Sequence, residues 1–256
     1  AASTFLLQPF FPSADYFFSF NSPSWSLGCE QLFYFCFPLI VPFLHTKRSL
    51  FITLLICLPI MLAGMYLTNE EQIKAYWYVN PFTRLPDFFV GVLLYQFYRS
   101  LCNKKLFYST GTLLEAGAVA LFLLFFLCAA DIPKVYRYSC YYWLPVSLII
   151  LIFALQQGGI SRLLSNRFLI IGGEISYSFY LIHLFIIDTY MRMSAHYHWQ
   201  IQWTISVPVI LCITIILSLL SFYYFEKPAN KWVKRIFTKK TIINQPHGII
   251  NKNTAN

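Results

Sequence analysis

The stretch WTISVPVILCITIILSLLSFYYF, residues Trp203–Phe225, contains no charged side chain. A helix needs about 20 mostly apolar residues to cross the hydrocarbon core of a bilayer. Lipid offers no partners to backbone N–H and C=O groups, so a crossing segment must satisfy them internally, and a helix does this simply. Residues Trp203–Phe225 therefore predict a transmembrane helix.

Six further stretches have a similar character, and the composition agrees with them. Hydrophobic residues make up 58% of the 256-residue chain and charged residues only 11%, whereas soluble domains carry about a quarter charged residues. We therefore expect an all-α fold, a polytopic membrane helix bundle of about seven transmembrane helices with the lipid bilayer as its partner. The other six predicted spans are Trp25–Leu44, Ser49–Leu67, Phe82–Leu101, Gly111–Ala130, Tyr141–Gln156 and Phe168–Tyr190.

The basic residues predict how the bundle is oriented. If residues 1–24 form an external loop, fourteen of the 19 Lys and Arg fall in segments on the inner side, seven of them in residues 226–256. Positive charge is enriched in cytoplasmic loops. We therefore expect a transmembrane domain over residues 25–225 and a basic cytoplasmic tail over 226–256. The net charge of +9 follows from this topology and does not indicate nucleic-acid binding.

Four ionisable residues from three predicted spans lie at similar depths, and ionisable groups inside a membrane are costly and usually mark function. Glu30 lies about 7–8 Å below the outer surface, counted at 1.5 Å per residue, and His183 lies in the outer half of its span. Arg84 and Asp87 begin their span on the outer side and can pair at their i,i+3 spacing. The depths agree, so we expect these four side chains to converge on a polar chamber.

Structural interpretations of the same residues stay open. Arg84 and Asp87 can form an interfacial salt bridge, Glu30 can hold helices together, and His183 can be a hydrogen-bonded histidine of the core. The seven cysteines include no CxxC pair, and the five histidines are scattered. His196 and His198 supply at most two ligands, so we expect no metal site.

Four segments resemble the landmarks of the acyltransferase 3 family, in the family's order and across about four-fifths of the chain. These membrane enzymes O-acylate, mostly O-acetylate, surface polysaccharides and similar acceptors. Read in this sequence, the segments are WSLGCEQLFY (Trp25–Tyr34) followed by FPL, NPFTRLPDFFVG (Asn80–Gly91), GGEISYSFYLIH (Gly172–His183) and FEKPA (Phe225–Ala229).

The chain also departs from the family pattern. Gln31 stands where the family often has a second Glu, so Glu30 alone can fill the acidic role there. The family has about ten helices, and its first helix carries a His usually assigned as the catalytic base. No such segment precedes Trp25, so we expect a chain lacking its first helices, inactive alone, with those helices of the same protein as a partner.

The resemblance implies transfer of an acyl group, usually acetyl, from acyl-CoA (acetyl-CoA) to a hydroxyl of a carbohydrate acceptor, at a bacterial inner membrane. Glu30 would orient the base or shape the acceptor site, and His183 would line the same chamber or act as a base itself. Trp25 would stack on a sugar, and Arg84 would orient Asp87 or bind the donor. Supporting roles fall to Ser26 and Tyr34 beside Glu30, and to Ser176, Tyr177 and Tyr180 beside His183.

Two other function classes remain open from sequence. A transporter or flippase of a lipid-linked or sugar substrate would also have many helices and buried polar groups, with proline-broken helices at its site. Its two halves would be expected to show a paired repeat, which this sequence lacks. The third possibility is an inactive remnant of the acyltransferase.

Overall fold

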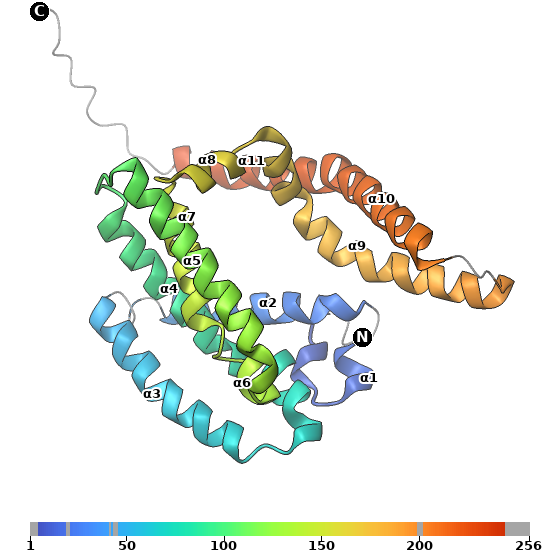
Figure 1. The fold of residues 1–256 in the computed structure, drawn as a ribbon, viewed down its shortest axis with the longest axis horizontal. Helices are drawn as coiled ribbons and strands as arrows, with labels where there is room; N and C mark the ends of the chain where they lie inside the picture. The colour runs from blue at the N-terminus through green and yellow to red at the C-terminus, as the bar shows by residue number, and fades with distance from the viewer. Residues whose placement is uncertain (1–4, 19–20, 41, 43–45, 199–201, 244–256) are drawn as a thin grey trace, which may run out of the picture. The chain divides into compact units, whose positions relative to one another are not determined.

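The computed structural model describes residues 5–18, 21–40, 42, 46–198 and 202–243. The chain divides into two compact units, residues 1–170 and 171–256, and each is described by itself. Helices are the only regular elements in the described part (Figure 1), so the all-α prediction is confirmed. The longer helices are α2 (Trp25–Ile40), α3 (Lys47–Tyr66), α4 (Pro81–Leu101), α5 (Tyr108–Cys128), α7 (Trp143–Leu155), α9 (Arg167–Tyr197), α10 (Trp203–Ser221) and α11 (Lys227–Ile243).

Four helical segments of the described chain have the length and apolar composition of a membrane span: Lys47–Tyr66, Tyr108–Asp131, Arg167–Tyr197 and Trp203–Phe237. They coincide, to within a residue at the ends or with extensions, with four of the seven predicted spans, and α7 is a shorter apolar helix at the fifth. The other two predicted spans are also helices. However, α2 has 16 residues, and α4 carries Arg84, Asp87 and Arg99, so neither has the length and apolarity of the four.

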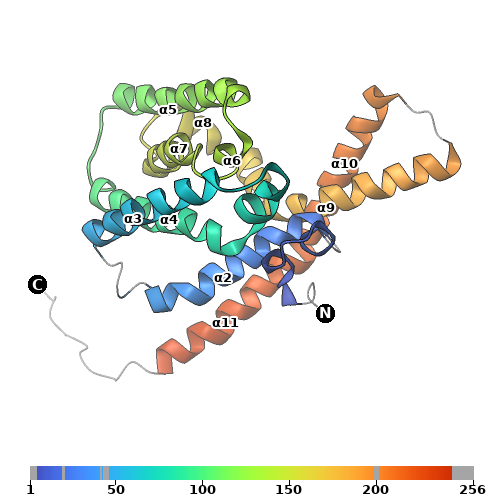
Figure 2. The same ribbon diagram turned by 90° about the horizontal axis from the view of Figure 1, so that it is seen from below.

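In the first unit α4 packs against α2, α3 and α7, and α7 packs against α5; Figure 2 shows α4, α7 and α5 side by side. Leu50 of α3 and Phe89 of α4 form a buried apolar cluster. A second cluster joins Met61 and Met65 of α3 to Trp77 and Val135. The first cluster packs α3 against α4, and the second packs the end of α3 against two segments that come later in the chain.

Short helical turns lie before and between the longer helices of the first unit. They comprise η2 (Gln8–Phe10), α1 (Ala14–Phe17), η3 (Ser22–Ser24), η4 (Glu70–Gln72), the π-helical turn η5 (Lys74–Val79), η6 (Ala129–Asp131), α6 (Lys134–Arg137) and α8 (Gly159–Leu164).

The second unit consists of most of α9, followed by α10, the π-helical turn η7 (Phe222–Glu226) and α11. The sequence predicts residues 226–256 only as a basic tail. The structure forms a helix over Lys227–Ile243 within that segment. Residues 244–256 of the predicted tail lie outside the described part of the chain.

Candidate functional site

The Asn80-Pro81 pair sets where α4 begins and so places Arg84 and Asp87. The Asn80 side chain accepts a hydrogen bond from the backbone N–H of Phe82 at 2.9 Å, which caps the helix at a donor that lacks an intrahelical partner. Pro81 stands at the first helical position, where its missing N–H costs nothing. Arg84 and Asp87 therefore fall one turn apart in the first turns of α4.

Arg84 and Asp87 form the ion pair that their spacing predicts. A guanidinium N–H of Arg84 donates to Asp87 Oδ2 at 3.1 Å, and Arg84 Nε donates to the Tyr78 carbonyl at 2.9 Å. The other carboxylate oxygen of Asp87 accepts from the indole N–H of Trp143 at 2.5 Å. The network connects α4 to the start of α7. The Arg84 and Asp87 side chains are 16% and 31% exposed, so their charges are partly shielded from water.

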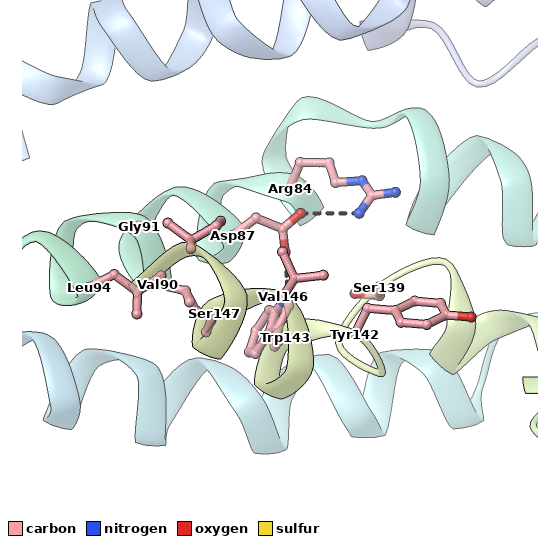
Figure 3. Close-up of a pocket in the computed structure, with 11 residues that line it drawn as sticks. Arg84, Asp87, Val90, Gly91, Leu94, Ser139, Tyr142, Trp143, Val146 and Ser147 are labelled. Carbon is pink, nitrogen blue, oxygen red and sulfur yellow. Dashed lines mark hydrogen bonds and ion pairs between the residues drawn. The ribbon is translucent and has the colours of Figure 1, made fainter. Parts of the chain in front are cut away.

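A cavity of about 300 Å³ opens beside this network, between α4 and α7 (Figure 3). Figure 3 shows the Arg84–Asp87 pair at one side of it, with Trp143 below the carboxylate. A methyl group added at Gly91 would meet nothing within 4 Å, so this position leaves the cavity wide. Its lining residues are Arg84, Asp87, Val90, Gly91, Leu94, Ser139, Tyr142, Trp143, Val146, Ser147 and Ile150.

Trp25 is joined to the same network through an aromatic neighbour. Its ring lies 4.8 Å from that of Tyr78, and the guanidinium of Arg84 lies 5.4 Å from the Tyr78 ring. Trp25 also packs against the buried cluster of Phe17, Ala75 and Val79. Part of the Trp25 surface is therefore already covered, which leaves less of it for a sugar.

Glu30 lies on α2 with an exposed side chain. The structure describes no contact of Glu30 with Ser26 or Tyr34, the two residues predicted to support it. The Ser26 hydroxyl donates to the Pro23 carbonyl at 3.1 Å, and Tyr34 is 72% exposed. The nearest buried neighbour in sequence, Cys29, donates to the Val79 carbonyl at 3.4 Å. The face of α2 that carries Glu30 is open in the described structure, so its catalytic role remains a prediction.

The predicted residues of the third landmark lie on α9, in the second unit. His183 Nδ1 lies 2.7 Å from the Tyr180 carbonyl of its own helix, and its ring stacks on Phe179 at 6.0 Å. Ser176 donates to the Gly173 carbonyl at 2.7 Å, and Tyr177 and Tyr180 are exposed. The two units are described separately, so the convergence of His183 with Glu30, Arg84 and Asp87 stays a prediction.

Glu115 is a buried carboxylate that the sequence reasoning missed. It lies on α5 with 1% exposure and accepts the backbone N–H groups of Gly158, Ile160 and Ser161 at 3.0, 2.8 and 3.1 Å. The Ser161 hydroxyl donates to it as well. This satisfies the free amides at the start of α8. The signal for it was a single acidic residue inside an otherwise apolar span.

A second missed contact lies in the other unit. The hydroxyl of Ser178, 2% exposed on α9, donates to the carboxylate of Glu226 at the end of η7. The two residues belong to the third and fourth landmark segments, 48 positions apart. Among the described residues no group of three His, Cys, Asp or Glu is placed to hold a metal ion.

A helical bundle with membrane-spanning segments and a partly buried charged network beside a cavity defines this protein as an integral membrane protein with a candidate polar site. The sequence profile of the acyltransferase domain matches residues 2–223. The chain belongs to the acyltransferase 3 family.

Similar proteins are bacterial. The O-acetyltransferase OatA of Staphylococcus aureus is 28% identical over 221 residues, which cover 81% of this chain and 36% of OatA. The acyltransferase MdmB of Streptomyces mycarofaciens is 27% identical over 202 residues, or 71% of this chain and 49% of MdmB. YrhL of Bacillus subtilis, provisionally named a peptidoglycan O-acetyltransferase, is 26% identical over 257 residues, or 92% of this chain and 39% of YrhL.

The chain thus spans between about a third and a half of the length of these relatives. No solved structure gives a significant match.

Proposed function

We propose that this chain is part of a membrane O-acetyltransferase that moves an acetyl group from acetyl-CoA to a hydroxyl of a cell-surface carbohydrate. Peptidoglycan is the acceptor class that the relatives favour, since YrhL carries it in its name. In this proposal the protein resides in a bacterial cytoplasmic membrane, with the basic C-terminal segment on the cytoplasmic side.

The observation that carries the proposal is the Arg84–Asp87–Trp143 network, in one of the family's landmark segments and at the wall of a cavity. Ion pairs in membrane helices usually face a cavity and serve function. Polar groups at one side of a mostly apolar pocket are also the usual makeup of a small-ligand site.

The reaction sets what the side chains must do. The acceptor oxygen attacks the thioester carbonyl, a C–O bond forms, the C–S bond breaks, and coenzyme A leaves as its thiol. A hydroxyl is a weak nucleophile at neutral pH, so a base must take its proton. Negative charge that develops on the carbonyl oxygen needs nearby donors. We propose that Arg84 donates a hydrogen bond to this carbonyl oxygen. Asp87 and the Tyr78 carbonyl fix the orientation of the Arg84 side chain.

Glu30 and His183 complete the proposed site. Glu30 would orient the base or hold acceptor hydroxyls, because its carboxylate is unburied on α2 and available to a substrate. His183 would line the chamber, its Nδ1 turned to the carbonyl of Tyr180 and its Nε2 left for another partner. Trp25 would stack its uncovered surface on a sugar ring.

The test is acetyl transfer by the complete gene product in proteoliposomes, with radiolabelled acetyl-CoA outside and a soluble glycan acceptor inside. We expect Glu30→Gln and Arg84→Gln to reduce label transfer at least about 100-fold, the size of effect typical for one general-base or oxyanion contact. Glu70→Gln, an exposed carboxylate on η4, serves as the control. Full activity in both site variants contradicts the proposed site. Glycan flux without covalent label points to a transporter.

A further inference from the structure

The last helix of the described chain, α11, separates basic from apolar side chains. At 100° per residue, Lys227, Lys231, Lys234 and Arg235 fall on one side. Apolar residues Trp232, Val233 and Ile236 fall on the opposite side, and they are 66%, 43% and 43% exposed. No Asp or Glu occurs between Lys227 and the end of the sequence. A helix of this kind suits the interface between water and an acyl-chain region.

The length of the preceding helix fixes where α11 begins. The helical segment Trp203–Phe237, which includes α10, η7 and the first part of α11, has 35 residues. These rise about 52 Å, against about 30 Å for the hydrocarbon core of a bilayer. The 19 residues of α10 already account for about 28 Å. The segment from Phe222 onward therefore starts at the membrane surface, where a helix can turn to lie along it.

The junction between α10 and α11 is built for such a turn. It is the π-helical turn η7, and π-helical insertions are common places for a helix to change direction. Its last residue, Glu226, accepts from Ser178, and the next residue, Lys227, lies 5.1 Å from the Tyr223 ring. Figure 2 shows α11 leaving the end of α10 at this point.

From these three observations we infer that α11 lies on the membrane surface at the inner end of α10 and binds anionic phospholipid headgroups. Trp232, Val233 and Ile236 insert among the acyl-chain ends, while Lys231, Lys234 and Arg235 contact lipid phosphates. Each basic residue near an anionic leaflet strengthens association about fivefold, so three of them contribute roughly a hundredfold. Lipid binding by α11 does not depend on the acyl-transfer reaction.

The experiment measures the tryptophan at position 232 in the complete protein. The protein and its Trp232→Phe variant are reconstituted in vesicles that contain bromine-labelled lipid, made from phosphatidylcholine with or without phosphatidylglycerol. The difference in quenching between the two proteins is the contribution of Trp232. We expect strong quenching with phosphatidylglycerol, and a loss of more than about half of it when Lys231, Lys234 and Arg235 are all replaced by Gln.

The matched control replaces Lys104 and Lys105, two exposed lysines between α4 and α5, with Gln. This change should leave the Trp232 signal unaltered. High salt should weaken the signal because it screens surface charge. Equal quenching in the two kinds of vesicle, or no quenching of Trp232 in either, overturns the inference. If inorganic phosphate or coenzyme A abolished the quenching of Trp232, the basic side of α11 would instead be a site for a soluble phosphate compound, which also overturns the inference.

Discussion

The indole N–H of Trp143 donates to the carboxylate of Asp87 at 2.5 Å, across 56 residues of sequence. The same carboxylate is held by Arg84 on its other oxygen. Because Trp143 is the first residue of α7 and Asp87 lies in the second turn of α4, this bond joins two helices at the wall of the cavity.

Trp143→Phe removes the indole donor and keeps an aromatic side chain. We expect the free energy of unfolding to fall by about 1.5–3 kcal/mol, the usual value of a hydrogen bond to a charged group. Thermal unfolding of the detergent-purified protein measures the effect. Trp203→Phe, at a position 77% exposed at the start of α10, should be neutral; an equal loss in both variants contradicts the assignment.

The Arg84–Asp87 pair is best tested by a double-mutant cycle. Arg84→Gln and Asp87→Asn should each destabilise the protein, because each leaves the other charge partly buried without its partner. The double variant should lose less than the sum, with a coupling of about 0.5–3 kcal/mol. Pairing Arg84→Gln with the distant Glu70→Gln should give additive effects. A coupling of zero between residues 84 and 87 would refute the bond.

Glu115→Gln replaces one of the two acceptor oxygens of the carboxylate with an NH₂ group. An NH₂ group is a donor and cannot accept from the backbone N–H groups that the carboxylate binds. We expect a cost of about 1–3 kcal/mol at the start of α8, seen as roughly 5- to 150-fold faster amide exchange. The amides to follow by hydrogen–deuterium exchange are those of Gly158, Ile160 and Ser161. Unchanged protection of these amides would show that Glu115 is dispensable there; Glu70→Gln is the comparison.

Ser178 and Ser176 belong to the same landmark segment. Ser178 contacts another element, whereas Ser176 bonds within its own helix. Ser178→Ala removes the bond to Glu226 and should destabilise the contact between α9 and η7 by about 1–3 kcal/mol, since a partly buried carboxylate loses a donor. Ser176→Ala removes only a bond to its own helix, at the Gly173 carbonyl, and should change stability little. Unfolding in denaturant compares them, and the reverse order would contradict the described geometry.

The sequence predicted features that depend on local composition and spacing. Long apolar runs identified the helices, and the i,i+3 separation of Arg84 and Asp87 predicted their ion pair. Sequence could not identify the partners supplied by other elements. Nothing near residue 87 indicates Trp143, and nothing near Glu115 indicates the amides of residues 158–161, because these contacts depend on how α4, α5, α7 and α8 pack.

One predicted span is described only in part, and one predicted grouping of side chains rests on depth alone. Predicted span Trp25–Leu44 is described as a helix only to Ile40, and residues 41 and 43–45 of the prediction lie outside the described residues. His183 and Glu30 were predicted to lie at the same depth from residue counts alone. Such counts give a height in the bilayer but no direction around a helix, so they cannot establish a contact between side chains.

The Glu115 carboxylate at the start of α8 also makes this place unfavourable for the coenzyme A of the proposed donor. Free amides at the start of a helix are a common resting place for phosphate, but here they already bind a carboxylate from the same chain. A pyrophosphate that approached this end would meet negative charge instead of open N–H donors. Binding of a pyrophosphate there would require cationic side chains such as Arg162, which lines the neighbouring pocket.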